Sequence, residues 1–75
     1  MIRYRDWDND SNVRAYEIGP DSISVQFKDG SVYLYTSLTP GRQEVAHMVR
    51  LAQAGDGLNS YISKVIKKRF ARKTY

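Results

Sequence analysis

The chain has 75 residues, no cysteine and a formal net charge of +4, so it is one domain without disulfides or Cys-based zinc sites. Residues 1–10 are charged, unlike a signal peptide, and no stretch approaches the ~20 apolar residues that span a membrane. Because small secreted domains usually depend on disulfides, we expect one cytoplasmic domain over residues 1–75, with no membrane partner.

The first part of the chain predicts an arm followed by a β-meander. Residues 1–12 are polar and charged, with Tyr4 and Trp7 as the only large apolar anchors, and predict an N-terminal arm. Three strands are expected next, at residues 13–18, 22–28 and 31–36. The second strand alternates apolar and polar side chains, as a half-buried strand does, and the third is rich in β-branched and aromatic residues. Between them, Asp29-Gly30 is a strong signal for a two-residue hairpin turn.

That two-residue turn also predicts which side chains share a face of the sheet. Residues opposite each other in an antiparallel pair point to the same side. In this register the core side holds Ile23, Val25, Phe27, Val32 and Leu34. Tyr33 and Tyr35 then lie together on the opposite side. For the first strand two inward-facing pairs stay open, Val13 with Ala15 or Tyr16 with Ile18.

Two helices are expected after the strands, at residues 40–54 and 58–70. Thr39 suits the N-cap of the first helix and Pro40 its first helical position. The apolar side chains that recur at helical spacing and extend the core are Val45, Met48, Val49, Ile62 and Val65. Two helices after a three-stranded antiparallel meander can cover only one face of the sheet. The sequence therefore predicts a two-layer α+β domain of order βββαα.

Positive charge is concentrated at the C-terminal end. Residues 1–56 hold six basic and eight acidic side chains, whereas residues 57–75 hold six basic and none acidic. These six are Lys64, Lys67, Lys68, Arg69, Arg72 and Lys73, the last two in a basic tail at residues 71–75. Spacings of three and four put the first three on one face of the second helix. Such a surface fits RNA or another polyanion, or it is a solvated face that keeps the protein soluble.

The paired tyrosines add a second candidate feature. Tyr33 and Tyr35 on an open sheet face would form a platform on which unpaired bases stack. The alternative is that tyrosine is simply a good strand former. With the six basic residues, the two tyrosines make up our candidate nucleic-acid-binding set. An RNA strand would then have to wrap around a sheet edge, because the tyrosines and the helices lie on opposite sides.

Several short motifs follow one another in a characteristic order. They are Val25-Gln26-Phe27-Lys28-Asp29-Gly30, Tyr33-Leu34-Tyr35, Leu38-Thr39-Pro40, Ala54-Gly55 and Leu58-Asn59-Ser60-Tyr61-Ile62. Together they resemble the KTSC family, a small domain found at the C-terminus of some lysyl-tRNA synthetases and as stand-alone bacterial proteins. The chain departs from the family pattern at Leu38-Thr39, at Gly55-Asp56-Gly57 and at the end of the last helix. The resemblance implies a single KTSC-like α+β domain over residues 1–75, with RNA binding proposed from the synthetase context.

Neither a calcium-loop-like spacing nor the remaining polar residues predict a reactive site. The spacing of an EF-hand calcium loop is shared by Asp6, Asp8, Asp10, Asn12, Arg14 and Glu17. However, Ser11 stands where the sharp turn requires glycine, and no entering helix fits before Asp6. His47 is the only histidine, and no activated nucleophile is visible. We therefore expect no metal, no cofactor and no catalytic residue.

These features predict a small non-enzymatic binding module. Our first interpretation is RNA binding through the tyrosine face and the basic last helix. The alternative is a protein-interaction or self-association module, because tyrosine is favoured at protein interfaces. The sequence leaves the oligomeric state and the identity of any partner open.

Overall fold

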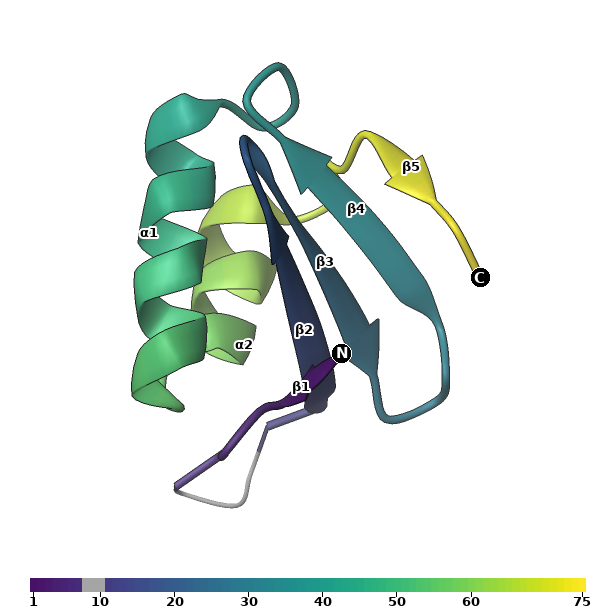
Figure 1. The fold of residues 1–75 in the computed structure, drawn as a ribbon, viewed down its shortest axis with the longest axis vertical. Coiled ribbons are helices and arrows are strands. Elements are labelled where there is room, and N and C mark those ends of the chain that lie inside the picture. The colour runs from purple at the N-terminus through teal and green to yellow at the C-terminus, as the bar shows by residue number, and fades with distance from the viewer. Residues whose placement is uncertain (8–10) are drawn as a thin grey trace.

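The computed structural model describes residues 1–7 and 11–75. Figure 1 shows two layers, an antiparallel sheet and the helices that cover one of its faces. In sheet order the strands are β1 (Ile2–Arg3), β2 (Val13–Gly19), β3 (Ser22–Phe27), β4 (Val32–Thr36) and β5 (Arg72–Lys73). The helical elements are α1 (Arg42–Ala54), α2 (Leu58–Tyr61) and η1 (Ile62–Ile66), a π-helical turn that continues α2. The α+β class is confirmed, and within the described residues no helix has the length and apolar run that a membrane crossing needs.

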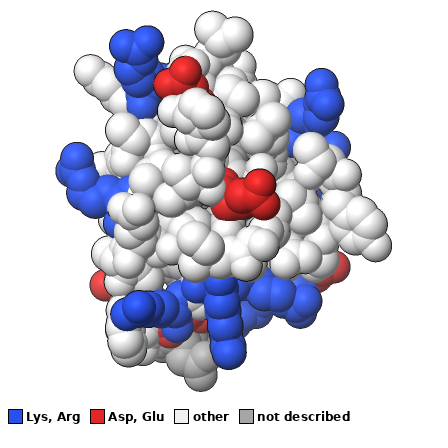
Figure 2. Space-filling view, viewed as in Figure 1, with Lys and Arg blue, Asp and Glu red and all other residues white. Residues whose placement is uncertain are grey.

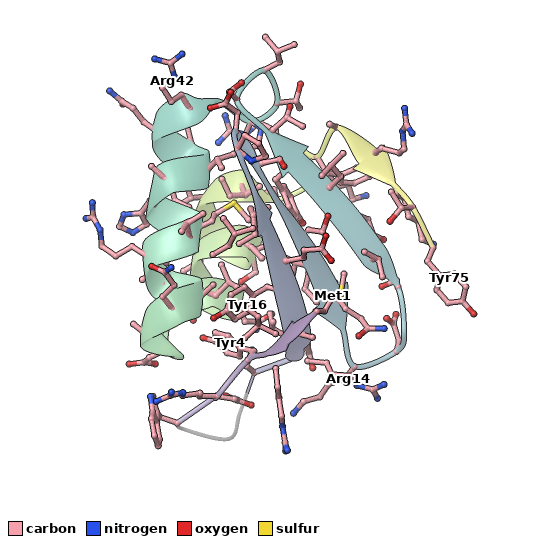
Figure 3. All side chains as sticks on the ribbon, in the orientation of Figure 1. Met1, Tyr4, Arg14, Tyr16, Arg42 and Tyr75 are labelled. Carbon is pink, nitrogen blue, oxygen red and sulfur yellow. The ribbon has the colours of Figure 1, made fainter. Side chains whose placement is uncertain are left out.

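Two short edge strands extend the expected meander on both sides. β1 pairs with β2, with Ile2 opposite Tyr16, so the start of the predicted N-terminal arm belongs to the sheet. Tyr4 is 3% exposed, and its hydroxyl accepts a hydrogen bond from the Leu58 backbone N–H at 3.2 Å. Figure 3 shows Tyr4 and Tyr16 directed into the space between sheet and helices. At the other edge β5 pairs with β4, so residues 71–75 are not a separate tail.

A β-bulge in β2 resolves which of its side chains face the core. The pairing with β3 shifts between Val13 and Ala15, so one extra residue is accommodated there. As a result Val13 and Tyr16 both lie in the core cluster, whereas Ala15, opposite Gln26, is buried on the other face and Ile18 is 37% exposed. Residues from both pairs left open by the sequence therefore enter the core.

The β3–β4 hairpin has a three-residue loop, Lys28-Asp29-Gly30, rather than the expected two-residue turn. The Phe27 N–H donates to the Ser31 carbonyl at 2.8 Å, and the Gly30 N–H donates to the Phe27 carbonyl at 2.9 Å. Gly30 has φ 93, as the third residue of such a loop requires. The Asp29 carboxylate accepts hydrogen bonds from the Ser31 N–H at 2.9 Å and the Ser31 hydroxyl at 2.7 Å.

The extra loop residue shifts β4 by one position and exchanges its two faces. Ile23 now lies opposite Tyr35, so Tyr35 is on the core side and only 1% exposed, and Tyr33 shares that side. Val32 and Leu34, which were expected in the core, lie on the open face. The predicted register and the exposed tyrosine platform are therefore wrong. β4 is apolar or aromatic at four successive positions, so its own pattern could not select a face. Of its two tyrosines, Tyr35 is buried and Tyr33 is partly buried against the core.

The first helix starts after Gly41 rather than at Pro40. Gly41 has φ 141, and Pro40 forms an isolated bridge with Thr36, so the expected N-cap at Thr39 is wrong. The helix ends at Gly55, whose φ of 76 and N–H bonds to the preceding turn are typical of a glycine C-cap. Along the helix the buried residues are Val45, Met48 and Ala52.

The second helix is shorter than expected. Its buried side chains, Leu58, Ile62 and Ile66, recur every four residues, and Val65, expected in the core, is 44% exposed. A π-helical turn holds more residues than an α-helical one, and this brings Ile66 rather than Val65 inward. The core cluster consists of Tyr4, Val13, Tyr16, Ile23, Val25, Tyr35, Val45, Met48, Ala52, Leu58, Ile62 and Ile66. Phe27 and Val49, also expected in the core, are partly buried against it.

Candidate functional site

A pocket of about 740 Å³ lies between the β3–β4 hairpin, β4 and the end of η1. Its volume is within the ~300–1,000 Å³ typical of ligand sites. The lining brings three partly buried aromatic side chains together with three basic ones, namely Phe27, Tyr33, Phe70, Lys28, Lys67 and Lys68. We call these six residues the aromatic–lysine pocket. Tyr35, Ile62, Asn12, Asp29 and Ser31 complete the wall.

Tyr33 is the centre of the aromatic part. Its ring centroid is 5.6 Å from that of Phe27 at an interplanar angle of 84°, and 4.6 Å from that of Phe70 at 76°. Both are edge-to-face contacts, which aromatic pairs favour. All three rings are only partly buried, and the Lys73 Nζ lies 5.9 Å from the Tyr33 ring centroid, within reach of a cation–π contact. The pocket thus offers aromatic surface with cations beside it.

Lys67 and Lys68, expected on one face of the last helix, lie instead in a tight turn after η1, which ends at Ile66. Lys67 has φ 56 and ψ −119, and the Arg69 N–H donates to the Ile66 carbonyl at 3.0 Å. These values match the first central position of a type II′ turn, which favours glycine. The turn directs the chain back to β4, where the Ala71 N–H donates to the Leu34 carbonyl at 2.8 Å and Phe70 meets Tyr33.

A lysine in this conformation is strained. Backbone positions of this kind cost about 1–3 kcal/mol for residues other than glycine, and such residues cluster at functional sites. Lys67 is exposed and lines the pocket. Packing in the core therefore does not explain why this position holds lysine rather than glycine.

The candidate residues from the sequence fall into two groups. Tyr33, Tyr35, Lys67 and Lys68 line the pocket, and Lys73, in β5, lies beside Tyr33 at its edge. Tyr35 is 1% exposed and offers no ring face to a ligand. The residues outside the pocket lining are Lys64, Arg69 and Arg72. The Arg69 guanidinium instead donates to the Val65 carbonyl at 2.9 Å, at the end of the helix.

The pocket brings together groups that the sequence placed on opposite sides of the sheet. Because β4 is shifted by one residue, Tyr33 faces the same side as Lys67 and Lys68. Aromatic and basic groups therefore line one pocket, on one side of the sheet. Sequence reasoning did not include Lys28, Phe27 and Phe70 among the candidate residues, and it expected Phe27 only in the core. A lone aromatic residue within a basic segment was a signal for Phe70.

Two pocket groups have shifted pKa values. Burial, with a smaller contribution from neighbouring Tyr33, raises the pKa of Tyr35 to about 12, so its hydroxyl stays neutral at physiological pH. The hydrogen bond from the Ser31 side chain, followed by that from the Ser31 backbone, lowers the pKa of Asp29 below its ordinary value. Asp29 is thus an ionised carboxylate among three lysines, and the lining keeps a positive excess.

The calcium-like spacing and the lone histidine have other surroundings. Asp8 and Asp10 lie outside the described residues. Glu17 is in β2, and Asp6 accepts hydrogen bonds from the Ser11 N–H at 3.2 and 3.3 Å. His47 lies against Tyr61, with ring centroids 4.5 Å apart. Over residues 1–7 and 11–75 no three acidic or histidine side chains gather as metal ligands do.

A scan against models of protein families, a search of curated proteins and a search of solved structures found no match to this chain. The resemblance to the KTSC family therefore stays a prediction that rests on its short motifs. What the pocket binds has to follow from the chemistry of its own side chains.

Proposed function

We propose that this domain is a non-enzymatic module that binds single-stranded RNA at the aromatic–lysine pocket. The observation that carries the proposal is the meeting of Tyr33 and Phe70 with Lys67 and Lys68 in one open pocket. Unpaired bases bind to aromatic side chains, and phosphates bind to basic ones. Both halves of a nucleotide therefore find a complementary group within the same pocket.

The charge of the pocket suits phosphate. Lysine ammonium groups are compact, hydrated point charges on flexible stems, and they contact phosphates that vary in position. The net charge of +4 adds a general attraction for polyanions. The strain at Lys67 also supports the proposal, because glycine would relieve it but would remove the ammonium group from the pocket.

The alternative function, a protein-interaction or self-association module, ranks second. It depended on a pair of tyrosines on the open face of the sheet, and Tyr35 is buried on the other face. The open face, which no helix covers in Figure 1, carries Val32 and Leu34 opposite Gln26 and Ser24. None of these four side chains is aromatic, whereas aromatic residues anchor many interfaces.

The proposal is tested by titrating the protein into a fluorescent, mixed-sequence single-stranded RNA and measuring anisotropy. At ~50 mM salt we expect a dissociation constant below ~100 μM. Lys67→Gln/Lys68→Gln should weaken binding about equally for all sequences and lower the slope of log K against log salt by about 1.4, about 0.7 for each lost phosphate contact.

The matched control removes the same charge elsewhere. Arg42 and Arg50 are exposed on α1 and line neither the aromatic–lysine pocket nor its rim; Figure 3 shows Arg42 projecting from the start of this helix. Arg42→Gln/Arg50→Gln should leave the salt slope nearly unchanged. Absence of binding by the wild-type protein at ~50 mM salt would contradict the proposed function.

A further inference from the structure

Four basic side chains from the first part of the chain gather around a second pocket, of about 270 Å³. They are Arg3, Arg5, Arg14 and Lys28, and we call them the arginine pocket. Figure 2 shows Lys and Arg side chains side by side along the lower edge of the molecule, and Figure 3 places Arg14 at that edge. Residues 1–56 are acidic on balance, so a count of charges along the sequence does not reveal this cluster.

Backbone pairing creates the cluster. β1 runs antiparallel to β2, with Arg3 opposite Ala15, and the Tyr4 N–H donates to the Arg14 carbonyl at 2.9 Å. The hairpin loop joins them because the Lys28 N–H donates to the Asn12 carbonyl at 2.7 Å. The Arg14 Nη2 in turn donates to the Lys28 carbonyl at 3.1 Å. Three segments that are separate in the sequence thus bring their cations to one place.

The charges of the arginine pocket are only partly compensated. Among the residues that the structure describes, Asp6 is the one acidic residue in its lining, and its carboxylate lies 3.7 Å from the Lys28 Nζ. The bond from Arg14 to the Lys28 carbonyl uses one of the several N–H donors of a guanidinium. The Arg5 guanidinium lies 5.7 Å from the Trp7 ring centroid, a contact that leaves its charge in place. Over residues 1–7 and 11–75, the side chains that line this pocket therefore carry an excess of positive charge.

The two pockets meet at Lys28, which lines both of them and whose side chain is 50% exposed. A mononucleotide has phosphate at one end only and fits a single pocket. An RNA strand carries a phosphate at every nucleotide and can occupy both pockets at once. Arginine is the side chain best suited to bind phosphate oxygens with two donors.

We infer that an RNA strand bound at the aromatic–lysine pocket continues past Lys28 into the arginine pocket, so that the ligand is an oligonucleotide of several nucleotides. This inference rests on the proposed function and specifies its substrate class. The aromatic–lysine pocket holds a base and its phosphate, and the arginine pocket holds phosphates further along the strand.

The test compares two RNA lengths and two double variants by anisotropy. Arg3→Gln/Arg5→Gln removes two charges from the arginine pocket, and Arg42→Gln/Arg50→Gln removes two from α1. With RNA of ~12 nucleotides, the first variant should bind about tenfold more weakly than wild type and lose about 1.4 from the salt slope, and the second should match wild type. With RNA of ~2 nucleotides, both variants should match wild type, whereas Lys67→Gln/Lys68→Gln should bind both lengths more weakly.

The possible failures can be told apart. If wild type binds the ~12-nucleotide RNA and both arginine variants bind it equally well, the path through the arginine pocket is wrong and the proposed function stands. If Arg3→Gln/Arg5→Gln weakens both lengths by the same factor, the two pockets do not bind successive parts of one strand. If wild type binds neither RNA, the proposed function itself fails, and the inference fails with it.

Discussion

At Lys67 the backbone and the side chain have opposite requirements. The backbone conformation, with φ 56 and ψ −119, favours glycine, while the ammonium group lines the aromatic–lysine pocket. Relief of about 1–3 kcal/mol of strain exceeds the about 0.5–1 kcal/mol of chain entropy that glycine costs. We therefore predict that Lys67→Gly is about 1 kcal/mol more stable to urea unfolding than Lys67→Ala.

The same pair of variants separates stability from binding. Both remove the ammonium group, so we expect them to lose RNA affinity to the same extent, by a factor of about 3–5 at ~100 mM salt. A Lys67→Gly protein that is less stable than Lys67→Ala would show that this turn is not strained as the structure indicates.

Tyr35 gives a prediction for alkaline pH. Its pKa is 10.0 in the unfolded chain and about 12 in the folded protein, so between these values the folded state binds more protons. Stability from this group is complete below pH 10 and is lost as pH rises towards 12, by at most about 2.7 kcal/mol. In urea unfolding, the stability of Tyr35→Phe should decrease less over this pH range than that of the wild-type protein. Because the two proteins share every other titrating group, the difference reports on Tyr35. Parallel pH profiles for both proteins would contradict a buried Tyr35 hydroxyl.

At the scale of elements, the register of β4 is tested by two neighbouring residues. Tyr35 is on the core face and 1% exposed, whereas Leu34 is half-buried on the open face. Tyr35→Ala should therefore cost about 3 kcal/mol or more, a large part of the stability of so small a domain. Leu34→Ala should cost about 1 kcal/mol. Urea unfolding measures both, and a larger loss for Leu34→Ala would restore the register expected from a two-residue turn.

The sequence predicted the central elements well because their patterns are strong. β3 alternates apolar and polar side chains, and α1 repeats its apolar residues at helical spacing, so both were located within two residues or so of their observed ends. The register of β4 could not be found in the same way. Its apolar residues occupy both faces, so the prediction depended on the loop length, and Asp29-Gly30 is compatible with two or three loop residues.

Other features could not be predicted because they depend on tertiary contacts. β1 and β5 have two residues each, too few for any periodicity. The type II′ turn after η1 lacks the glycine that usually signals such a turn. For the candidate site, Tyr33 was identified from a hairpin register, and Lys67 and Lys68 from a helical spacing, that the structure does not show. Their meeting with Phe27, Lys28 and Phe70 required the observed register and the chain reversal at Lys67.

For the whole molecule, the two faces of the sheet have different roles in this account. One face packs on the helices and ends in the aromatic–lysine pocket, which joins the arginine pocket at Lys28. The other face is open in Figure 1 and carries the aliphatic side chains of Val32 and Leu34. We propose that RNA binds on the face that packs on the helices. Because β4 has side chains on both faces, its signals can distinguish binding to one face from binding to the other.

The most direct measurement is therefore an NMR titration with single-stranded RNA that follows side-chain signals on both faces of β4. We predict that the ring signals of Tyr33, Phe27 and Phe70 shift progressively with RNA, while the methyl signals of Val32 and Leu34 stay nearly constant. Side-chain signals are needed because neighbouring backbone amides on one strand are too close together to distinguish the faces. Shifts confined to the Val32 and Leu34 methyl groups, or no shifts at ~50 mM salt, would contradict binding at the aromatic–lysine pocket.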